Sequence, residues 1–246
     1  MFYFDSFYGK KILKSTLLKK EDCFFTTREF VLTPSIRTDL EEECKTNRNF
    51  LLDKFSSKNI YCAEQTHSAN IEIIKKETFL YKNTDALISN IKNSVLLLNF
   101  ADCVPIILYS EKDNTGALVH AGWRGTAQNI TFLTVEKMKK ELNINPKDIK
   151  ALIGPAIGKC CFETNEDVFK QLIKENCLKE SYTKIKDKYN IDLKLLNKQQ
   201  LLNSGIINID ICNYCTCCMS GVFFSYRKEK GHTARHSAIL KIRGDR

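Results

Sequence analysis

The chain has 246 residues, of which 43% are hydrophobic and 27% charged, so its composition is that of a soluble globular protein long enough to bury a substantial core. Its net charge of +9 comes mainly from lysines interleaved with acids, and no basic stripe with aromatics indicates nucleic-acid binding. No apolar run is long enough to span a membrane and the N-terminus does not resemble a signal peptide, so the expected location is the cytoplasm.

The apolar pattern predicts four helices and seven strands in mixed order. The helices are expected over residues 40–55, 126–143, 165–178 and 193–205, and the strands over residues 59–65, 70–76, 94–100, 104–110, 115–121, 149–155 and 221–227. This order predicts an α+β fold. Since there is no linker, low-complexity tract or internal repeat, we expect one domain over residues 1–246.

Local signals support three of the helices. In the second, Ile130, Leu133, Met138 and Leu142 are expected to lie near one buried face. Asn165 is a candidate N-cap for the third helix. The fourth is expected to end at a glycine, residue 205.

Two of the four histidines follow or end predicted strands. His67 follows the strand at 59–65, and His120 ends the apolar run "GALVH". His232 and His236 lie four residues apart, but Gly231 argues against a helix there, so both are predicted to be surface residues. Taken alone, each histidine is more often a hydrogen-bonded structural residue than a metal ligand.

The segment "NFADCVPIIL" places two polar residues in an apolar run. Pro105 restricts the preceding backbone, so Asp102 and Cys103 are expected at a break between two strands. His67, Cys103 and His120 would then all lie at strand ends and could converge on one metal ion. Zinc accepts this ligand set, and three protein ligands leave a fourth position open.

The stretch "HAGWRGTA" combines a turn with an arginine. A helix that begins after Gly122 would present free N–H groups to an anion, and Arg124 would add charge and donors. The alternative is a tight turn that both glycines permit, with Trp123 in the core and Arg124 in solvent.

The chain contains eleven cysteines, an odd number at irregular spacing. This usage indicates reduced thiols, most of them buried as small apolar residues. Cys160 and Cys161 in "IGPAIGKCCFE" are interpreted as packing residues. In "DICNYCTCC", Cys212 and Cys215 form a C-x-x-C that would need two further ligands, so whether the cluster from Cys212 to Cys218 binds a metal stays open.

Five segments in this order resemble a bacterial protein family: "EQTHSANI", "ADCVPIIL", "VHAGWRG", "GPAIGKCCFE" and "FFSYRKEKGHTAR". The family is called YfiH-like, laccase-domain, multicopper polyphenol oxidoreductase, peptidoglycan editing factor or purine nucleoside phosphorylase. The resemblance spans residue 24 to about residue 240. It implies mixed β-sheets packed between helices, and zinc bound by His67, Cys103 and His120.

The resemblance also implies phosphorolysis of adenosine, inosine and methylthioadenosine, together with deamination of adenosine. The expected partners are therefore a purine nucleoside and phosphate, with neither nucleic acid nor membrane. For deamination, zinc would lower the pKa of a water molecule that attacks C6 of adenine. Asp102, Cys103 and Arg124 are the expected catalytic residues, with Asp102 as the acid/base. The expected phosphate ligands are Arg28, Arg48, Arg124 and Arg227.

Two segments depart from the family pattern, namely "EFVLTPS" after Arg28 and "TAR" with Ala234 where glycine is usual. Both are expected to shape the substrate pocket. The oxidase name does not fit, because four histidines cannot fill a multicopper centre. Copper could bind the single three-residue site, but zinc is the expected ion.

Two other functions remain open. The same metal centre could hydrolyse an amide in a cell-wall precursor, because an activated water attacks an amide as well as a purine ring. Alternatively, the site could be purely structural in a non-enzymatic metal-binding protein, in which case a fourth protein ligand is expected. The oligomeric state is not predicted.

Overall fold

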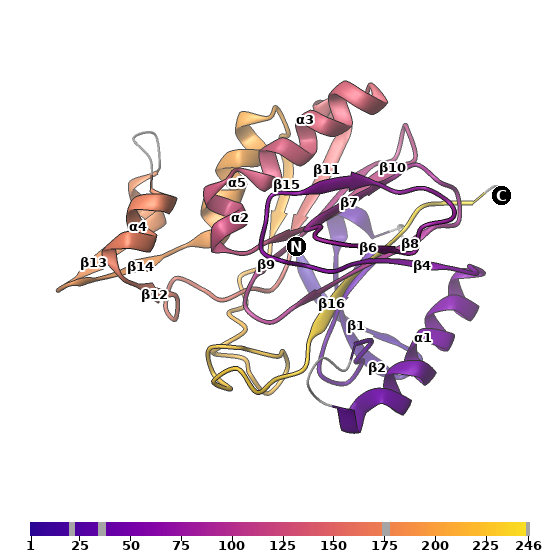
Figure 1. Cartoon of the computed structure of the whole chain (residues 1–246), viewed down its shortest axis with the longest axis horizontal. Helices are drawn as coiled ribbons and strands as arrows, with labels where there is room; N and C mark the ends of the chain where they lie inside the picture. Colours follow the sequence, from indigo (N-terminus) through magenta and orange to yellow (C-terminus); the bar gives the residue numbers. More distant parts are fainter. Residues whose placement is uncertain (20–22, 34–37, 174–177, 245–246) are drawn as a thin grey trace.

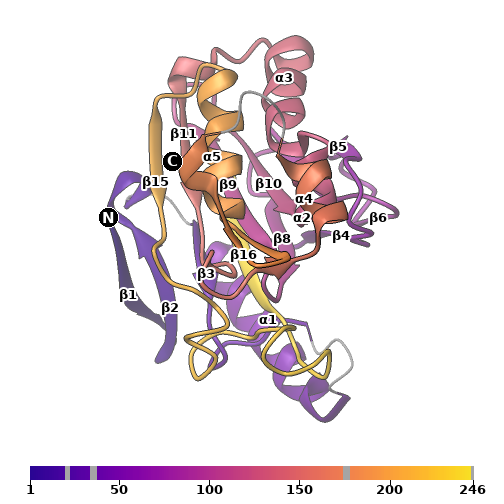
Figure 2. The same cartoon turned by 90° about the vertical axis from the view of Figure 1, so that its left-hand side faces the viewer.

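The computed structural model describes residues 1–19, 23–33, 38–173 and 178–244. Two large mixed β-sheets pack against each other, and helices cover their outer faces (Figures 1 and 2). Helices α3 (Ile130–Leu142) and α5 (Leu193–Asn203) lie on one side, and α1 (Glu41–Phe55) lies on the opposite side. The predicted α+β class with mixed sheets between helices is confirmed.

The first large sheet has seven strands in the order β1-β2-β3-β16-β8-β4-β6. In that order they span Phe2–Phe7, Lys10–Ser15, Cys23–Thr26, His236–Lys241, Val95–Phe100, Ile60–Ala63 and Leu80–Tyr81. The sheet is mixed because β4 runs parallel to β6 and β8, whereas the other pairs are antiparallel.

The second large sheet has six strands in the order β15-β11-β9-β10-β7-β5. In that order they span Asn208–Ile211, Ile149–Ile153, Val104–Ser110, Thr115–Ala121, Ala86–Ser89 and Ile71–Ile73. The edge pairs β11–β15 and β7–β5 are parallel, and the central pairs are antiparallel.

A small sheet and α4 project from one end of the molecule (Figure 1). Its strands β12, β14 and β13 span Glu163–Thr164, Lys188–Ile191 and Tyr182–Ile185. The two short α-helices are α2 (Trp123–Ala127) and α4 (Glu166–Leu172). Single 3-10 turns span Thr16–Leu18, Thr38–Leu40, Pro146–Asp148 and Lys179–Ser181.

The central strands are apolar on both faces because both faces are covered. In β8, Leu96 and Leu98 pack into the core between the two sheets, whereas Val95 and Leu97 face the cluster that contains α1. Strand β9 alternates in the same way between the inter-sheet core and the core beneath α3 and α5. This double coverage explains the nearly continuous apolar runs of the sequence.

The structure corrects three expectations about the elements. Residues 221–227 form turns instead of a strand, because the N–H groups of Val222 and Phe223 both donate to Met219 O. The helix expected over 126–143 is two helices, separated at Asn129, whose φ is 62°. Leu133 is 41% exposed, since the buried face of α3 follows Ile130, Thr134 and Met138.

The other predicted helices are present with shifted ends. Helix α1 coincides with the prediction over 40–55 to within one residue. Helix α4 begins after Asn165, although the side chain of Asn165 makes no capping hydrogen bond, and residues 174–177 of its predicted range lie outside the described residues. Helix α5 ends two residues before Gly205, whose φ is 93°.

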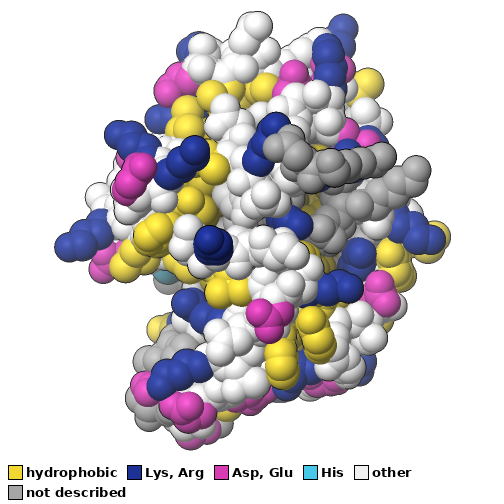
Figure 3. Space-filling model, turned by 90° about the vertical axis from the view of Figure 1, so that its right-hand side faces the viewer, with side chains coloured by type: hydrophobic (Ala, Val, Ile, Leu, Met, Phe, Trp, Pro, Cys, Tyr) yellow, Lys and Arg dark blue, Asp and Glu magenta, His cyan; other side chains and the backbone are white. Residues whose placement is uncertain are grey.

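In the described part of the chain, no helix has the length and hydropathy needed to cross a bilayer. Figure 3 shows one face of the molecule, on which Lys and Arg side chains are scattered among Asp and Glu side chains. The charges of this face therefore form no single-sign patch.

Candidate metal centre

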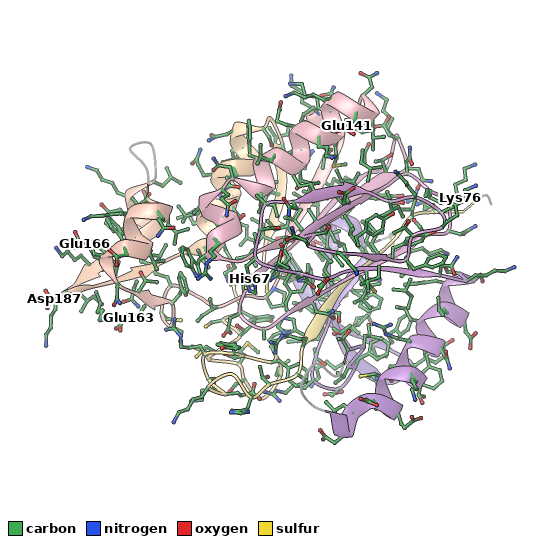
Figure 4. The ribbon with its side chains drawn as sticks, viewed as in Figure 1. His67, Lys76, Glu141, Glu163, Glu166 and Asp187 are labelled. Carbon is green, nitrogen blue, oxygen red and sulfur yellow. The ribbon has the colours of Figure 1, made fainter. Side chains whose placement is uncertain are left out.

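Three strand-end residues meet at one place, as the sequence predicts. His67 lies in the loop after β4, Cys103 in the connection between β8 and β9, and His120 near the end of β10. One ligand atom from each lies within 4.8 Å of the others. The β9–β10 register pairs His120 with Pro105, which brings His120 next to the Cys103 turn. Figure 4 shows His67 near the middle of the molecule.

A buried carboxylate, Asp85, organises the two histidines. Its Oδ1 lies 2.7 Å from Nδ1 of His120 and accepts the backbone N–H of His67 at 3.0 Å. Its Oδ2 accepts the N–H and the hydroxyl of Ser68, both at 2.7 Å. Because Nδ1 of His120 is occupied by Asp85, Nε2 is the nitrogen left to bind a metal, which is the usual carboxylate–histidine arrangement of metal sites.

The backbone around the centre is unusual at two residues, and a third residue leaves little room for a side chain. His67 and Asp102 have φ values of 61° and 84°, in the left-handed region that non-glycine residues rarely adopt. A Cβ at Gly122 would lie 3.0 Å from Cδ2 of His67 and 3.2 Å from Sγ of Cys103. Glycine at 122 therefore leaves room for the ligand side chains.

The electrostatics of the centre favour the thiolate form of Cys103. Burial acts to raise the pKa of Cys103, but the charge and hydrogen bonding of His120, together with those of His67, lower it to about 6. Burial also acts to raise the pKa of Asp85, and hydrogen bonds from His120 and Ser68 instead hold it at about 2. A thiolate is the form of cysteine that binds metals.

The three residues open onto a cavity of about 590 Å³, a size that suits a small-molecule ligand. Aromatic walls come from Trp123, Phe162 and Tyr226. Polar groups come from Gln65 and Asn99, along with the arginines described next.

The structure brings two of the four expected phosphate-binding arginines to this cavity. Arg124 lines it with its guanidinium 4.4 Å from the Trp123 ring centroid, and Arg227 lines it while donating to Cys161 O at 2.8 Å. Arg28 and Arg48 are not among the lining residues. Arg28 pairs with Glu229, and Arg48 donates to Leu32 O at 2.8 Å.

Asp102 lines the cavity, but both of its carboxylate oxygens already accept hydrogen bonds. Oδ1 accepts from Thr216 Oγ1 at 2.6 Å, and Oδ2 accepts from the backbone N–H of Arg227 at 2.7 Å. Asp102 therefore ties the loop that carries Arg227 to the turn that carries Cys103. Helix α2, which carries Arg124, has only five residues, so the side chains and not the helix terminus supply the positive charge here.

The sequence analysis did not single out several residues of the site. Gln65, Asn99, Phe162, Tyr226 and Arg235 line the cavity, and Asp85 orients the histidines. Asp85 had a signal, because it directly precedes the apolar run of β7 and a buried acid needs partners. Arg235 stands in the "TAR" segment already noted as a departure, whereas Gln65 and Asn99 carry no signal of their own.

Two expectations outside this site are wrong. His236 is completely buried in β16, whereas His232 is exposed as predicted. Cys160, interpreted as a packing residue, is exposed, and it lies next to the exposed Cys218 in a second cysteine group. None of the ten described cysteines forms a disulfide bond, and Cys177 lies outside the described residues.

Comparison with known proteins identifies one family and several similar proteins. The family described as multi-copper polyphenol oxidoreductase laccase matches residues 32–243. The purine nucleoside phosphorylase CA_C1699 of Clostridium acetobutylicum is 33% identical over 238 residues, which cover 94% of this chain and 98% of the relative. The purine nucleoside phosphorylase YlmD of Bacillus subtilis is 29% identical over 221 residues, which cover 83% of this chain and 79% of the relative.

Comparison with solved structures shows that the fold is also similar to that of known proteins. The crystal structure of the hypothetical protein YfiH from Bacillus licheniformis superposes with a TM-score of 0.87 at 28% identity. The match covers 94% of this chain and 96% of that chain. The arrangement of sheets described above is therefore shared with proteins of this kind over nearly their whole length.

Proposed function

This chain belongs to the family described as multi-copper polyphenol oxidoreductase laccase, and on that premise we propose that it is a zinc-dependent purine nucleoside phosphorylase that also deaminates adenosine. The expected substrates are adenosine, inosine and methylthioadenosine. The observation that carries the proposal is the group of His67, Cys103 and His120 on the wall of a cavity that arginines also line.

The three residues fit zinc by their donor chemistry. Two imidazoles and one thiolate are ligands that zinc prefers, and Asp85 provides the outer carboxylate that such histidines usually have. Among the described residues no fourth His, Cys, Asp or Glu joins the group, which supports a catalytic site with an open position over a structural one. When bound, the ion would supply Lewis-acid charge next to the reacting bond.

The residues of the chain have separate proposed tasks. Arg124 and Arg227, with the neighbouring Arg235, would hold phosphate by charge and by paired N–H donors. Trp123 and Phe162 offer flat apolar surfaces to a purine ring. Asp102, the one carboxylic acid among the described residues that line the cavity, is the proposed proton carrier.

The family description does not carry over as an oxidase activity. A multicopper site needs many histidines, and the chain has four, of which His236 is buried apart from the centre in β16. A single three-residue centre suits hydrolytic or phosphorolytic chemistry better than the oxidation of polyphenols.

The test is a product assay with purified, zinc-loaded protein. Adenosine with phosphate should give adenine and ribose 1-phosphate, and adenosine without phosphate should give inosine and ammonia. Cys103→Ala should abolish both products in a protein with an unchanged circular dichroism spectrum, whereas Cys62→Ser in β4 should retain full activity. Turnover by Cys103→Ala at the wild-type rate would refute the metal-dependent proposal.

A parallel incubation separates the amidohydrolase alternative. A serine-bearing muramyl precursor is supplied in place of the nucleoside, and release of the amino acid is measured. Cleavage of this precursor without any nucleoside turnover would replace the proposed function with cell-wall precursor editing.

A further inference from the structure

Four cysteines from two distant segments meet outside the site described above. Cys160 and Cys161 lie in the turn after β11, and Cys215 and Cys218 lie in the turn after β15. Their sulfur atoms all lie within 4.8 Å of one another. An isolated bridge between Ala156 and Cys215 aligns the two segments side by side.

The sulfur separations match those of a thiolate cage. Sγ of Cys218 lies 3.6 Å from Sγ of Cys160 and 3.5 Å from Sγ of Cys161. In a tetrahedral zinc site with Zn–S bonds of about 2.3 Å, neighbouring sulfurs are about 3.8 Å apart. A disulfide requires about 2.05 Å, so these atoms are grouped without being bonded to each other.

The local backbone lets all four side chains converge. Cys160 and Cys161 occupy a tight turn in which the N–H groups of Cys161 and Phe162 both donate to Gly158 O, at 2.9 and 3.0 Å. In such a turn, unlike an extended strand, adjacent side chains are able to point to one side. Cys215 and Cys218 have C-x-x-C spacing, and the turn closes as Met219 N donates to Cys215 O at 2.9 Å.

The surroundings also suit a metal-bound thiolate. The N–H of Gly158 donates to Sγ of Cys215 at 3.1 Å, the kind of outer hydrogen bond that supports metal ligands. A Cβ at residue 158 would lie 3.1 Å from Cβ of Cys215 and 3.2 Å from Sγ of Cys160. Glycine at 158 therefore permits the close approach of the two segments.

We propose that Cys160, Cys161, Cys215 and Cys218 bind one zinc ion in a second, structural site. Four thiolates fill a tetrahedral coordination sphere and leave no position for substrate, so this ion would have no catalytic role. It would lock together two loops that line the cavity, since Arg227 donates to the carbonyl of Cys161 and Phe162 is the next residue. The proposal does not depend on the proposed function.

Cys212 is excluded from the site. It is completely buried in the core between the sheets and is absent from the group of four. The ligands of the "DICNYCTCC" segment are therefore Cys215 and Cys218, and the two further ligands that a C-x-x-C requires come from Cys160 and Cys161.

The first experiment counts zinc. Full-length protein is loaded with zinc under reducing conditions, dialysed and measured by elemental analysis. We expect two zinc ions per chain in the wild type and in Cys62→Ser, and one in Cys103→Ala and in Cys218→Ser. Loss of all zinc in Cys103→Ala, or two zinc ions in Cys218→Ser, would overturn the proposal.

The second experiment needs no variant, so it holds even if Cys218→Ser fails to fold. Zinc-loaded and zinc-free wild-type protein are alkylated under reducing, non-denaturing conditions, and the labelled cysteines are identified by mass spectrometry. Zinc should slow alkylation of Cys160 and Cys218 at least tenfold and leave Cys62 unaffected. Equal labelling of Cys160 and Cys218 with and without zinc would contradict the site.

The two proposals fail in different ways. If Cys103→Ala retains one zinc ion and the wild type turns over no nucleoside, the proposed function fails and the structural site stands. If the wild type turns over nucleosides with a single zinc ion that Cys103→Ala lacks, the structural site fails and the proposed function stands.

Discussion

At the scale of single residues, Asp85 links the fold to the candidate metal centre. Its carboxylate is completely buried and holds the His120 ring and the His67 backbone at once. A buried carboxylate with these partners fixes the tautomer and the direction of the histidine. The candidate ligands could be picked out because they lie at the ends of predicted strands, whereas the role of Asp85 arises only when β7 and β10 pair.

Replacing Asp85 should therefore weaken metal binding. Asp85→Asn keeps the shape but loses the charge that orients His120, and we expect a 10- to 100-fold loss of zinc affinity with a matching loss of activity. Competition with a fluorescent chelator measures the affinity. Asp113→Asn is the matched control. Asp113 also accepts a hydrogen bond, from Ser110, but Ser110 lies at the end of β9 that is farther from Cys103. An unchanged zinc affinity in Asp85→Asn would contradict the orienting role.

A second residue-scale prediction concerns the space beside the ligands. The φ of Gly122 is −67°, which alanine adopts freely, so Gly122→Ala tests steric contact with His67 and Cys103 rather than backbone strain. We expect at least a tenfold loss of zinc affinity with little change in stability. Gly221→Ala is the control, because nothing lies within 4 Å of its added Cβ. The argument fails if both variants bind zinc equally well.

At the scale of elements, the sequence predicts the long central strands but misses several others, including the short buried strands β3 and β7 and the buried strand β16. Strands β8, β9 and β10 are found because both of their faces are covered and their apolar runs are continuous. Strands β1 and β2 lie at one end of the seven-stranded sheet, where Asp5 and Ser6 in β1 and three lysines in β2 dilute the apolar strand pattern. The segment at 221–227 has the composition of a strand, but the structure forms no strand there. Its two phenylalanines, Phe223 and Phe224, are nevertheless buried.

Strand β16 carries a buried histidine with a consequence for stability. Burial lowers the pKa of His236 to about 3, so it stays neutral in the folded protein while the unfolded chain binds a proton below about pH 6.5. Between about pH 3 and pH 6.5 the unfolded state therefore binds more protons than the folded state. The free energy of unfolding should fall as the pH drops from about 6.5 toward 3, by up to about 1.4 kcal/mol per pH unit from this group.

His236→Leu should remove this contribution. In urea titrations of zinc-free protein at pH 7, 5 and 4, the variant should lose less stability on acidification than the wild type. His232→Leu is the control, because His232 is exposed and its replacement should leave the acid dependence as it is. Parallel pH profiles for wild type and His236→Leu would show that His236 is not the group responsible.

At the scale of the whole molecule, the two large sheets share one core, and the candidate metal centre lies where their connections meet. Phe25 of β3 packs so closely against Gly154, which follows β11, that a Cβ added at residue 154 would overlap its ring. The motifs around His67, Cys103 and His120 could be read from the sequence one at a time. Their shared cavity, and the pairing of the two cysteine segments, depend on contacts between distant parts of the chain.

Because of this shared core, the chain should unfold as one unit, as the single-domain expectation requires. Phe25→Ala in the seven-stranded sheet should lower the free energy of unfolding by about 3–5 kcal/mol. The single tryptophan, Trp123, reports on the cavity beside the other sheet, while far-UV circular dichroism reports on the whole backbone. Both signals should shift to the same lower urea midpoint, because neither sheet keeps its inner face covered without the other. Ile207→Ala, at a residue that is 70% exposed, should shift neither signal by more than the equivalent of about 0.5 kcal/mol. A tryptophan transition that stays in place while the circular dichroism transition moves would show that the two sheets belong to separate folding units.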